Sequence, residues 1–181
     1  GCVKYNKEKN GGNIKILKPI IVYYSLDGNT RQAAETLAGL IEADLCEIQP
    51  VKPIKSDGKP TFRVLMRGGR QVTFGLCPKI RDFTVDLGEY DRIILGTPVW
   101  AGKCASFVRT FAKKYAKQHS LSEKVTAVFT LSGSGENAKC IDDLRKLLPN
   151  ISETVSLFDR SHSGSSENDG RIQDFARKLG E

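Results

Sequence analysis

The sequence predicts one α/β domain, a doubly wound five-stranded parallel sheet in the order 2-1-3-4-5 with helices on both faces in three layers. Strand-length apolar segments alternate along the chain with segments in which apolar residues recur at helical spacing. Three strand segments are apolar throughout, which is typical of strands buried on both faces, and two are interrupted by polar residues, which is typical of sheet edges. We expect the domain to span residues 19–181, after a polar and partly disordered lead-in at 1–18.

The first two strands and the helix between them have clear patterns. Segment 19–24 reads Pro-Ile-Ile-Val-Tyr-Tyr and predicts a buried strand. In segment 30–41 the apolar residues fall on one helical stripe, and the charged residues lie outside it. Segment 44–48 predicts a short edge strand, because two acidic residues interrupt it.

The later elements follow the same alternation. The connection from 50 to 87 is too long for an ordinary crossover and is expected to contain a helix at 61–66. Segment 104–117 has the clearest helical pattern, with aromatic residues on one side and lysines on the other. The remaining expected elements are strands at 91–96, 125–130 and 154–158 and helices at 136–148 and around 172–179.

Composition argues against two classes of protein. The net charge is +7, but the basic residues are spread along the chain without an aromatic-interleaved basic motif, so nucleic-acid binding is not expected. No apolar run approaches the roughly 20 residues that span a bilayer. A cytoplasmic location is therefore the expectation.

The cysteines are odd in number, widely spread and without a C-x-x-C pair. This pattern predicts reduced, mostly buried thiols and no metal site. An alternative remains for the first of them, which could belong to a lipid-anchored or exported protein. The five residues are Cys2, Cys46, Cys77, Cys104 and Cys140.

Glycines and small polar residues follow three of the expected strands. Because the carboxyl ends of parallel strands meet at one edge, these three loops should face a common ligand at the switch point between the first and third strands. The first loop combines backbone N–H groups, hydroxyls and a helix N-terminus, which suit a phosphate ester. The second contains the only tryptophan, which in this setting favours stacking on a planar ring. The candidate residues are Ser25, Asp27, Gly28, Asn29, Thr30, Thr97, Pro98, Val99, Trp100, Ala101, Gly102, Ser132, Gly133, Ser134 and Gly135.

The loops together resemble those of the flavodoxins, in particular the short flavodoxin family of bacteria and archaea. The resemblance covers about residues 19–180 and rests on Tyr-Tyr-Ser-x-x-Gly-Asn-Thr at 23–30, on the run at 89–102 and on the loop at 130–135. It implies FMN as the cofactor, with its phosphate held by Ser25, Gly28, Asn29 and Thr30. It also implies that 97–102 line the isoalloxazine, with Trp100 against it, and that 132–135 bound the pyrimidine or ribityl side.

This family resemblance implies electron transfer as the function. The protein would be an electron carrier or an NAD(P)H-dependent FMN or quinone reductase, with a redox partner protein or a small-molecule donor or acceptor. No catalytic side chain is expected, because the flavin carries the reaction and the protein places and tunes it.

Asp27 departs from the family pattern, which usually has Thr or Ser at this position. A carboxylate beside a phosphate dianion is repelled by about 1–4 kcal/mol at a surface-like dielectric. Asp27 could turn outward, cap the following helix or weaken FMN binding. The alternative function is therefore a flavin-free or partner-binding module on a flavodoxin scaffold.

The positive net charge is a second departure, because flavodoxins that act as low-potential carriers are typically acidic. If the charge near the flavin follows the net charge, the reduced flavin is stabilised and its potential is less negative, which favours a reductase. Charges more than roughly 8–10 Å away are screened, so the local charge decides.

Overall fold

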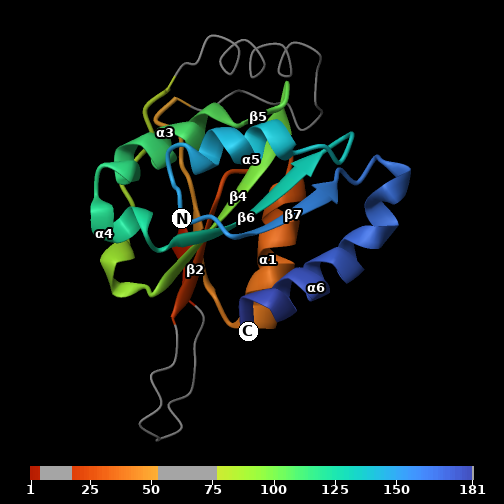
Figure 1. Cartoon of the computed structure of the whole chain (residues 1–181), viewed down its shortest axis with the longest axis horizontal. Coiled ribbons are helices and arrows are strands. Elements are labelled where there is room, and N and C mark those ends of the chain that lie inside the picture. The colour runs from red at the N-terminus through yellow and green to blue at the C-terminus, as the bar shows by residue number, and fades with distance from the viewer. Residues whose placement is uncertain (5–17, 53–76, 181) are drawn as a thin grey trace, which may run out of the picture.

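A single sheet runs through the middle of the protein, and helices cover both of its faces (Figure 1). The computed structural model describes residues 1–4, 18–52 and 77–180. The helix expected at 61–66 lies outside the described residues. The predicted α/β class with three layers is confirmed.

Most elements begin within two residues of their expected positions. The strands are β1 (Cys2–Val3), β2 (Pro19–Tyr23), β3 (Asp44–Glu47), β4 (Arg92–Trp100), β5 (Lys103–Cys104), β6 (Val125–Ser132) and β7 (Glu153–Phe158). The helices are α1 (Asn29–Ile41), α3 (Ser106–Ala116), α4 (His119–Ser122), α5 (Ala138–Arg145) and α6 (Asn168–Gly180), with 3-10 turns η1 (Leu87–Glu89) and η2 (Ser163–Glu167).

The order of the strands matches the predicted doubly wound topology. Along the sheet the order is β1-β3-β2-β4-β6-β7, with β5 paired to β4 beside this path. The strands β3, β2, β4, β6 and β7 are parallel, which is the order 2-1-3-4-5 of the prediction. The additional strands β1 and β5 are antiparallel to their neighbours. The sequence does not predict them, because two residues are too few to show a period.

The central strand β2 is buried on both faces. Ile20 and Val22 belong to the core on the α3 and α5 side of the sheet, whereas Ile21 and Tyr23 belong to the core on the α1 and α6 side. This alternation explains why the strand is apolar throughout. Each such aliphatic side chain contributes about 1.5–3 kcal/mol when it is fully buried.

The third expected strand is longer than predicted. The sequence suggests a strand at 91–96 and a loop at 97–102, but β4 continues to Trp100. Thr97 and Pro98 remain paired with Thr130 and Leu131 of β6, so the sheet extends into the predicted loop. A proline and a tryptophan after a glycine resemble a loop in sequence, and the pairing with β6 is a long-range contact that the local pattern cannot reveal.

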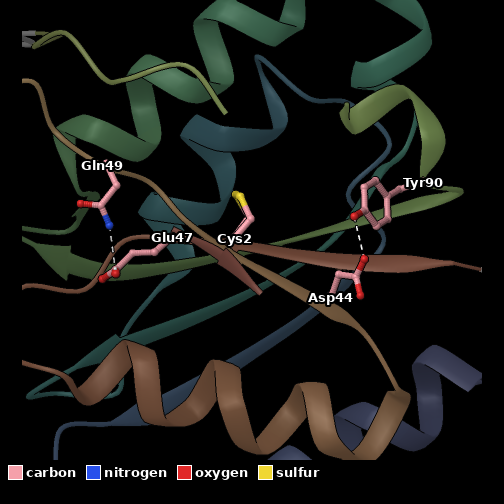
Figure 2. The surroundings of a disulfide bond; sticks show 6 residues. Cys2, Asp44, Glu47, Gln49 and Tyr90 are labelled. Atoms are coloured by element: carbon pink, nitrogen blue, oxygen red, sulfur yellow. Dashed lines mark hydrogen bonds between the residues drawn. A yellow bond between two sulfur atoms is a disulfide. The ribbon is translucent and has the colours of Figure 1, made fainter. Parts of the chain in front are cut away.

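The prediction of reduced, mostly buried cysteines is wrong for two of the five. Cys2 and Cys46 form a disulfide that joins β1 to β3. Figure 2 shows the surroundings of this bond, with Cys2 near the strand that carries Glu47. Cys77 is exposed, whereas Cys104 and Cys140 are buried free thiols, as predicted. The antiparallel pairing of β1 with β3 brings together two cysteines that are 44 residues apart, and their spacing alone gives no sign of it.

The strand β3, which the sequence predicts at the edge of the sheet, is covered there by β1 and carries a buried acid. Tyr90 Oη donates a hydrogen bond of 2.7 Å to Asp44 Oδ2 (Figure 2). Burial raises the pKa of the Tyr90 hydroxyl, and the hydrogen bond to Asp44 raises it further. Asp44, one of the polar residues from which the sequence predicts an edge strand, is therefore only 5% exposed and has a hydrogen-bond partner.

Within the described ranges, the helices are all too short or too polar to cross a membrane.

Candidate functional site

The carboxyl ends of β2, β4 and β6 lie side by side at one edge of the sheet, here called the rim. In the register of the sheet, Tyr23 lies opposite Gly96, and Gly96 lies opposite Phe129. Tyr24 N donates a hydrogen bond of 3.1 Å to Gly96 O, so the first two of these strands stay joined up to their loops. The segments that the sequence predicts to bind a ligand therefore start at a common edge.

Residues 25–28 form a tight turn from β2 into α1. Gly28 is the N-cap of α1 and has a φ of 93°, a left-handed conformation that glycine adopts without a steric penalty. Ser25 Oγ accepts a hydrogen bond of 3.1 Å from Gly28 N, which closes the turn. The turn places the positive end of the α1 dipole at the rim.

The carboxylate of Asp27 lies at this helix end. Its Oδ1 accepts a hydrogen bond of 3.1 Å from Asn29 N, and its Oδ2 accepts one of 3.0 Å from Asn29 Nδ2. Of the three arrangements considered for Asp27, the structure contains the one in which the carboxylate caps the start of α1. The cap uses a backbone donor that a phosphate at this helix end would otherwise share.

Two buried hydroxyl groups at the rim have no hydrogen-bond partner within the described part of the chain. One belongs to Thr30, which is 1% exposed in the first turn of α1, and the other to Ser132, which is 6% exposed at the end of β6. Leaving a buried hydroxyl unpaired costs about 1–3 kcal/mol. Both residues belong to the predicted binding loops, and a ligand with acceptor oxygens would supply the hydrogen-bond partners that the two hydroxyls lack.

The second predicted loop is a two-residue turn between β4 and β5. Trp100 pairs with Lys103, so Ala101 and Gly102 form the turn. Their φ angles are 48° and 74°, and a type I′ hairpin turn requires positive φ at both positions. Ala101 therefore adopts a conformation that costs an L-residue about 1–2 kcal/mol.

Trp100 packs mainly against the core. Its side chain is 9% exposed, and its ring centroid lies 5.9 Å from that of Tyr24 in an edge-to-face contact. The Tyr24 ring in turn packs on Phe107, with 4.8 Å between the centroids. Burial raises the pKa of the Tyr24 hydroxyl. The sequence favours stacking of the indole on a ligand, and in the structure only a small part of the indole is open for such a contact.

Thr97 holds the hairpin in place. It is fully buried, and its Oγ1 accepts a hydrogen bond of 3.0 Å from Ala105 N and donates one of 2.9 Å to Pro98 O. This hydroxyl is therefore already paired, unlike those of Thr30 and Ser132. Its role is to fix the turn before α3.

A cavity of about 570 Å³ lies between the hairpin and the third predicted loop. This volume is within the usual range of small-molecule sites. The structure thus brings together the ends of two segments that the sequence predicts to share a ligand. The lining residues are Gly102, Gly135, Glu136, Asn137, Ala138 and Lys139.

Asp159 is a rim residue outside the three predicted loops. Its backbone N donates a hydrogen bond of 3.0 Å to Ser132 O, and its Oδ2 lies 3.9 Å from where a Cβ on Gly133 would be. Burial and then the charge of Asp27 raise the pKa of the Asp159 carboxyl, and His162 lowers it. The signal that could have found it is its position directly after the last strand, at the carboxyl end of the sheet.

A family model described as flavodoxin matches residues 18–163. The chain belongs to the flavodoxin family. The match confirms the resemblance seen in the three loops and covers the described sheet from β2 to β7.

Solved structures with the same fold are flavoproteins of low sequence identity. A protein described as a flavoprotein from Bacteroides uniformis ATCC 8492 is 22% identical, with a TM-score of 0.69 over 90% of this chain and 99% of that one. One from Bacteroides eggerthii DSM 20697 is 24% identical, with a TM-score of 0.64 over 91% and 98%. A flavoprotein from Lactobacillus acidophilus NCFM, solved in complex with FMN, is 21% identical, with a TM-score of 0.60 over 86% and 98%. No protein of curated function matches the chain.

The rim of this flavodoxin does not share the positive charge of the whole chain. Asp27 and Asp159 follow β2 and β7, and Glu136, in the loop after β6, lines the cavity beside the hairpin. Of the described cations, Lys103 belongs to the hairpin, Lys139 Cδ lies 3.6 Å from where a Cβ on Gly102 would be, and Arg160 directly follows Asp159 and donates a hydrogen bond to Gln32 of α1. These three carboxylates and three cations balance, whereas the whole chain has a net charge of +7.

Proposed function

We propose that this flavodoxin binds FMN non-covalently at the rim and passes electrons to a partner. Membership of the flavodoxin family supports this proposal, as does the FMN complex of the flavoprotein from Lactobacillus acidophilus NCFM. The observation that carries it is the pair of buried, unpartnered hydroxyls of Thr30 and Ser132 at the rim. Acceptor oxygens of a phosphate and of a ribityl chain or flavin ring would satisfy them.

The residues of the first turn would hold the phosphate. Thr30 supplies a hydroxyl donor, and the backbone N–H groups at the start of α1 supply further donors and a favourable dipole. The hairpin residue Gly102 and the loop residue Gly135 would flank the isoalloxazine side, because they share the cavity of about 570 Å³. When bound, FMN supplies one- and two-electron redox chemistry that no side chain offers.

The described charges of the rim do not favour the reductase over the carrier. Negative charge near the flavin opposes the additional negative charge of its reduced form and lowers the reduction potential. Asp27, Asp159 and Glu136 would act in this direction, whereas Lys103, Lys139 and Arg160 would oppose them. The expectation of a less negative potential requires that the local charge follows the net charge, and the charges described at the rim balance instead.

Asp27 and Asp159 also support the alternative function, a flavin-free or partner-binding module. Asp27 accepts a hydrogen bond from Asn29 N at the start of α1, and its charge acts on Asp159. A phosphate bound at this helix end would be repelled by both carboxylates. Under this alternative the Asp27 carboxylate replaces the phosphate at the helix N-terminus permanently. The two unpartnered hydroxyls favour the FMN-binding protein, because a permanent internal replacement would be expected to satisfy them.

The direct test is titration of the purified protein with FMN, followed by flavin fluorescence. Saturable quenching at micromolar protein concentration, with an affinity about tenfold lower in the Thr30→Val variant, would support FMN binding at the rim. A titration without saturation would leave the flavin-free module as the function. Anaerobic reduction of the complex with NADPH then separates the two roles, because a reductase accepts electrons from the nucleotide directly and a carrier needs a protein donor.

The electron donor of this flavodoxin depends on which of the two roles it has. We expect a redox partner protein, with NAD(P)H as the electron source only for a reductase. A cytoplasmic location is part of this proposal, and the Cys2–Cys46 disulfide is the observation that opposes it, because stable disulfides are typical of oxidising compartments.

A further inference from the structure

A second cavity lies on the α3 and α5 face of the sheet, next to the hairpin. Its volume is about 230 Å³, and four of its eight lining residues carry a positive charge. One lining residue, Asp143, is acidic. The lining residues are Lys103, Cys104, Arg109, Lys113, Asp143, Leu144, Lys146 and Leu147.

The cations gather around the single carboxylate. Lys146 Nζ donates a hydrogen bond of 2.9 Å to Asp143 Oδ1. This bond and the charges of Lys146, Arg109 and Lys103 lower the pKa of the Asp143 carboxyl, although its partial burial opposes them. One carboxylate therefore lies among three cations, and Lys113 lines the same cavity. The local excess is three positive charges, because the lining has four cations and one anion.

Three of the four cations have no ion-pair partner among the described residues. These are Lys103, Arg109 and Lys113, whereas the adjacent Lys114 is paired with Asp82 at 2.7 Å. Lys103 and Arg109 are only half-exposed, so their charges are less screened than those of fully exposed lysines. Unpaired, partly buried cations around a concave space are costly unless an anion binds there.

We propose that this cavity is a binding site for the diphosphate group of a small molecule. Arginine binds phosphate oxygens in a bidentate manner, and lysines add point charges around them. Three excess positive charges match a diphosphate better than a monoanion. The inference goes beyond FMN binding and does not rest on it.

The location connects this site to the rim. Lys103 belongs to β5 and pairs with Trp100 across the two-residue turn. A ligand anchored by its diphosphate at Lys103 therefore lies next to the hairpin that borders the cavity containing Gly102. A phosphate-bearing electron donor or substrate would be held beside the proposed flavin site.

Isothermal titration of the full-length protein with inorganic pyrophosphate tests the proposal. We expect saturable binding that weakens about tenfold or more between roughly 50 and 200 mM salt, since the contacts are ionic. The Arg109→Gln/Lys113→Gln double variant should weaken binding about tenfold or more. Lys103→Gln is the second variant, for use if the double variant unfolds. Lys178→Gln on α6, on the opposite face of the sheet, is the matched control and should change the affinity by less than about twofold.

ADP and NADPH, titrated in the same way, distinguish the possible sources of the diphosphate. Equal affinity for pyrophosphate and ADP would support a site that recognises the diphosphate alone, and tighter binding of either nucleotide would support a nucleotide site. Absence of saturable pyrophosphate binding, or equal binding by the wild type and both variants, would overturn the proposal. Competition between pyrophosphate and FMN would also overturn it, because it would place the pyrophosphate at the rim. A failure of FMN binding with intact pyrophosphate binding would overturn the proposed function alone.

Discussion

Asp27 and Asp159 place two carboxylates at the same end of the sheet, where burial of Asp159 and then the charge of Asp27 raise the pKa of the Asp159 carboxyl. The two residues are far apart in the sequence and follow different strands, β2 and β7. Their proximity places two negative charges at this end of the sheet, in a chain whose net charge is +7. It is the feature that most affects how this flavodoxin can hold a phosphate.

Removing the charge of Asp27 should strengthen FMN binding. We expect Asp27→Asn to lower the dissociation constant of FMN about five- to tenfold, since about 1 kcal/mol of repulsion is relieved at a surface-like dielectric. An asparagine keeps the Oδ1 acceptor for Asn29 N, so the cap of α1 is preserved. Fluorescence titration measures the change, and Asp174→Asn on α6 is the control for a general effect of net charge. An unchanged affinity in Asp27→Asn would mean that the carboxylate does not face the phosphate.

Asp159 should make stability depend on pH. The raised pKa means that the native state disfavours the ionised carboxylate. The protein is therefore more stable below the ordinary carboxyl pKa, and it loses this stability as the pH rises through the raised pKa. Asp159→Asn should therefore stabilise the protein at pH 7 by about 0.5 kcal/mol, since Asp159 is half-buried and solvent screens it. At about pH 3 the variant and wild type should have equal stability. Urea unfolding at both pH values checks this, and a variant that is less stable at pH 7 would contradict it.

Thr30→Val should separate ligand binding from stability. The substitution keeps the shape of the side chain and removes a buried hydroxyl that has no partner. The unfolding free energy of the free protein should rise or stay within about 0.5 kcal/mol, whereas FMN affinity should fall about tenfold. Thr97→Val is the contrasting variant, because the Thr97 hydroxyl accepts a hydrogen bond from Ala105 N. Loss of this hydroxyl should destabilise the free protein by about 1–3 kcal/mol. Equal losses of stability in both variants would argue against an unpaired Thr30 hydroxyl.

The hairpin turn should be improved by a residue that tolerates positive φ. Ala101 has a φ of 48°, which asparagine adopts more readily than alanine. We expect Ala101→Asn to raise the free energy of unfolding by about 0.5–1 kcal/mol and Ala101→Val to lower it by more than about 1 kcal/mol. Chemical denaturation measures both. The opposite order of the two variants would be inconsistent with the observed turn.

The disulfide between Cys2 and Cys46 should be detectable chemically. Peptide mapping without reductant should recover the two cysteines in one linked fragment, and reduction should lower the unfolding free energy by about 2–4 kcal/mol, the usual effect of a disulfide. Cys77→Ser is the control, because Cys77 is exposed and lies outside the disulfide, so the effect of reduction on stability should be the same in this variant as in the wild type. Alkylation of Cys2 and Cys46 in the native protein without reductant would contradict the bond.

The order of the strands in the sheet was predictable because the burial of a strand determines which of its residues are apolar. β2 and β6 are apolar on both faces and β7 is mixed, and these differences separate central strands from edge strands. The first turn was predictable for a similar reason, because Gly28 and Asn29 mark the start of α1 directly.

Three features depend on contacts that no local pattern records. The extension of β4 to Trp100 depends on pairing with β6, and the burial of the indole depends on Tyr24. The cation cavity gathers residues from β5, α3 and α5. Each feature joins segments whose relative position is set by packing and register.

The sequence by itself therefore determined the fold class, the strand order and the loops that meet at the rim, since periodicity and turn residues act over a few neighbours. Only the tertiary structure determines the charge of the rim and which two cysteines form a disulfide. Asp159 reaches Asp27, and Cys2 reaches Cys46, only after the strands that carry them have paired in the sheet. Long-range strand pairing brings these residues together, and the order of residues along the chain does not reveal that pairing.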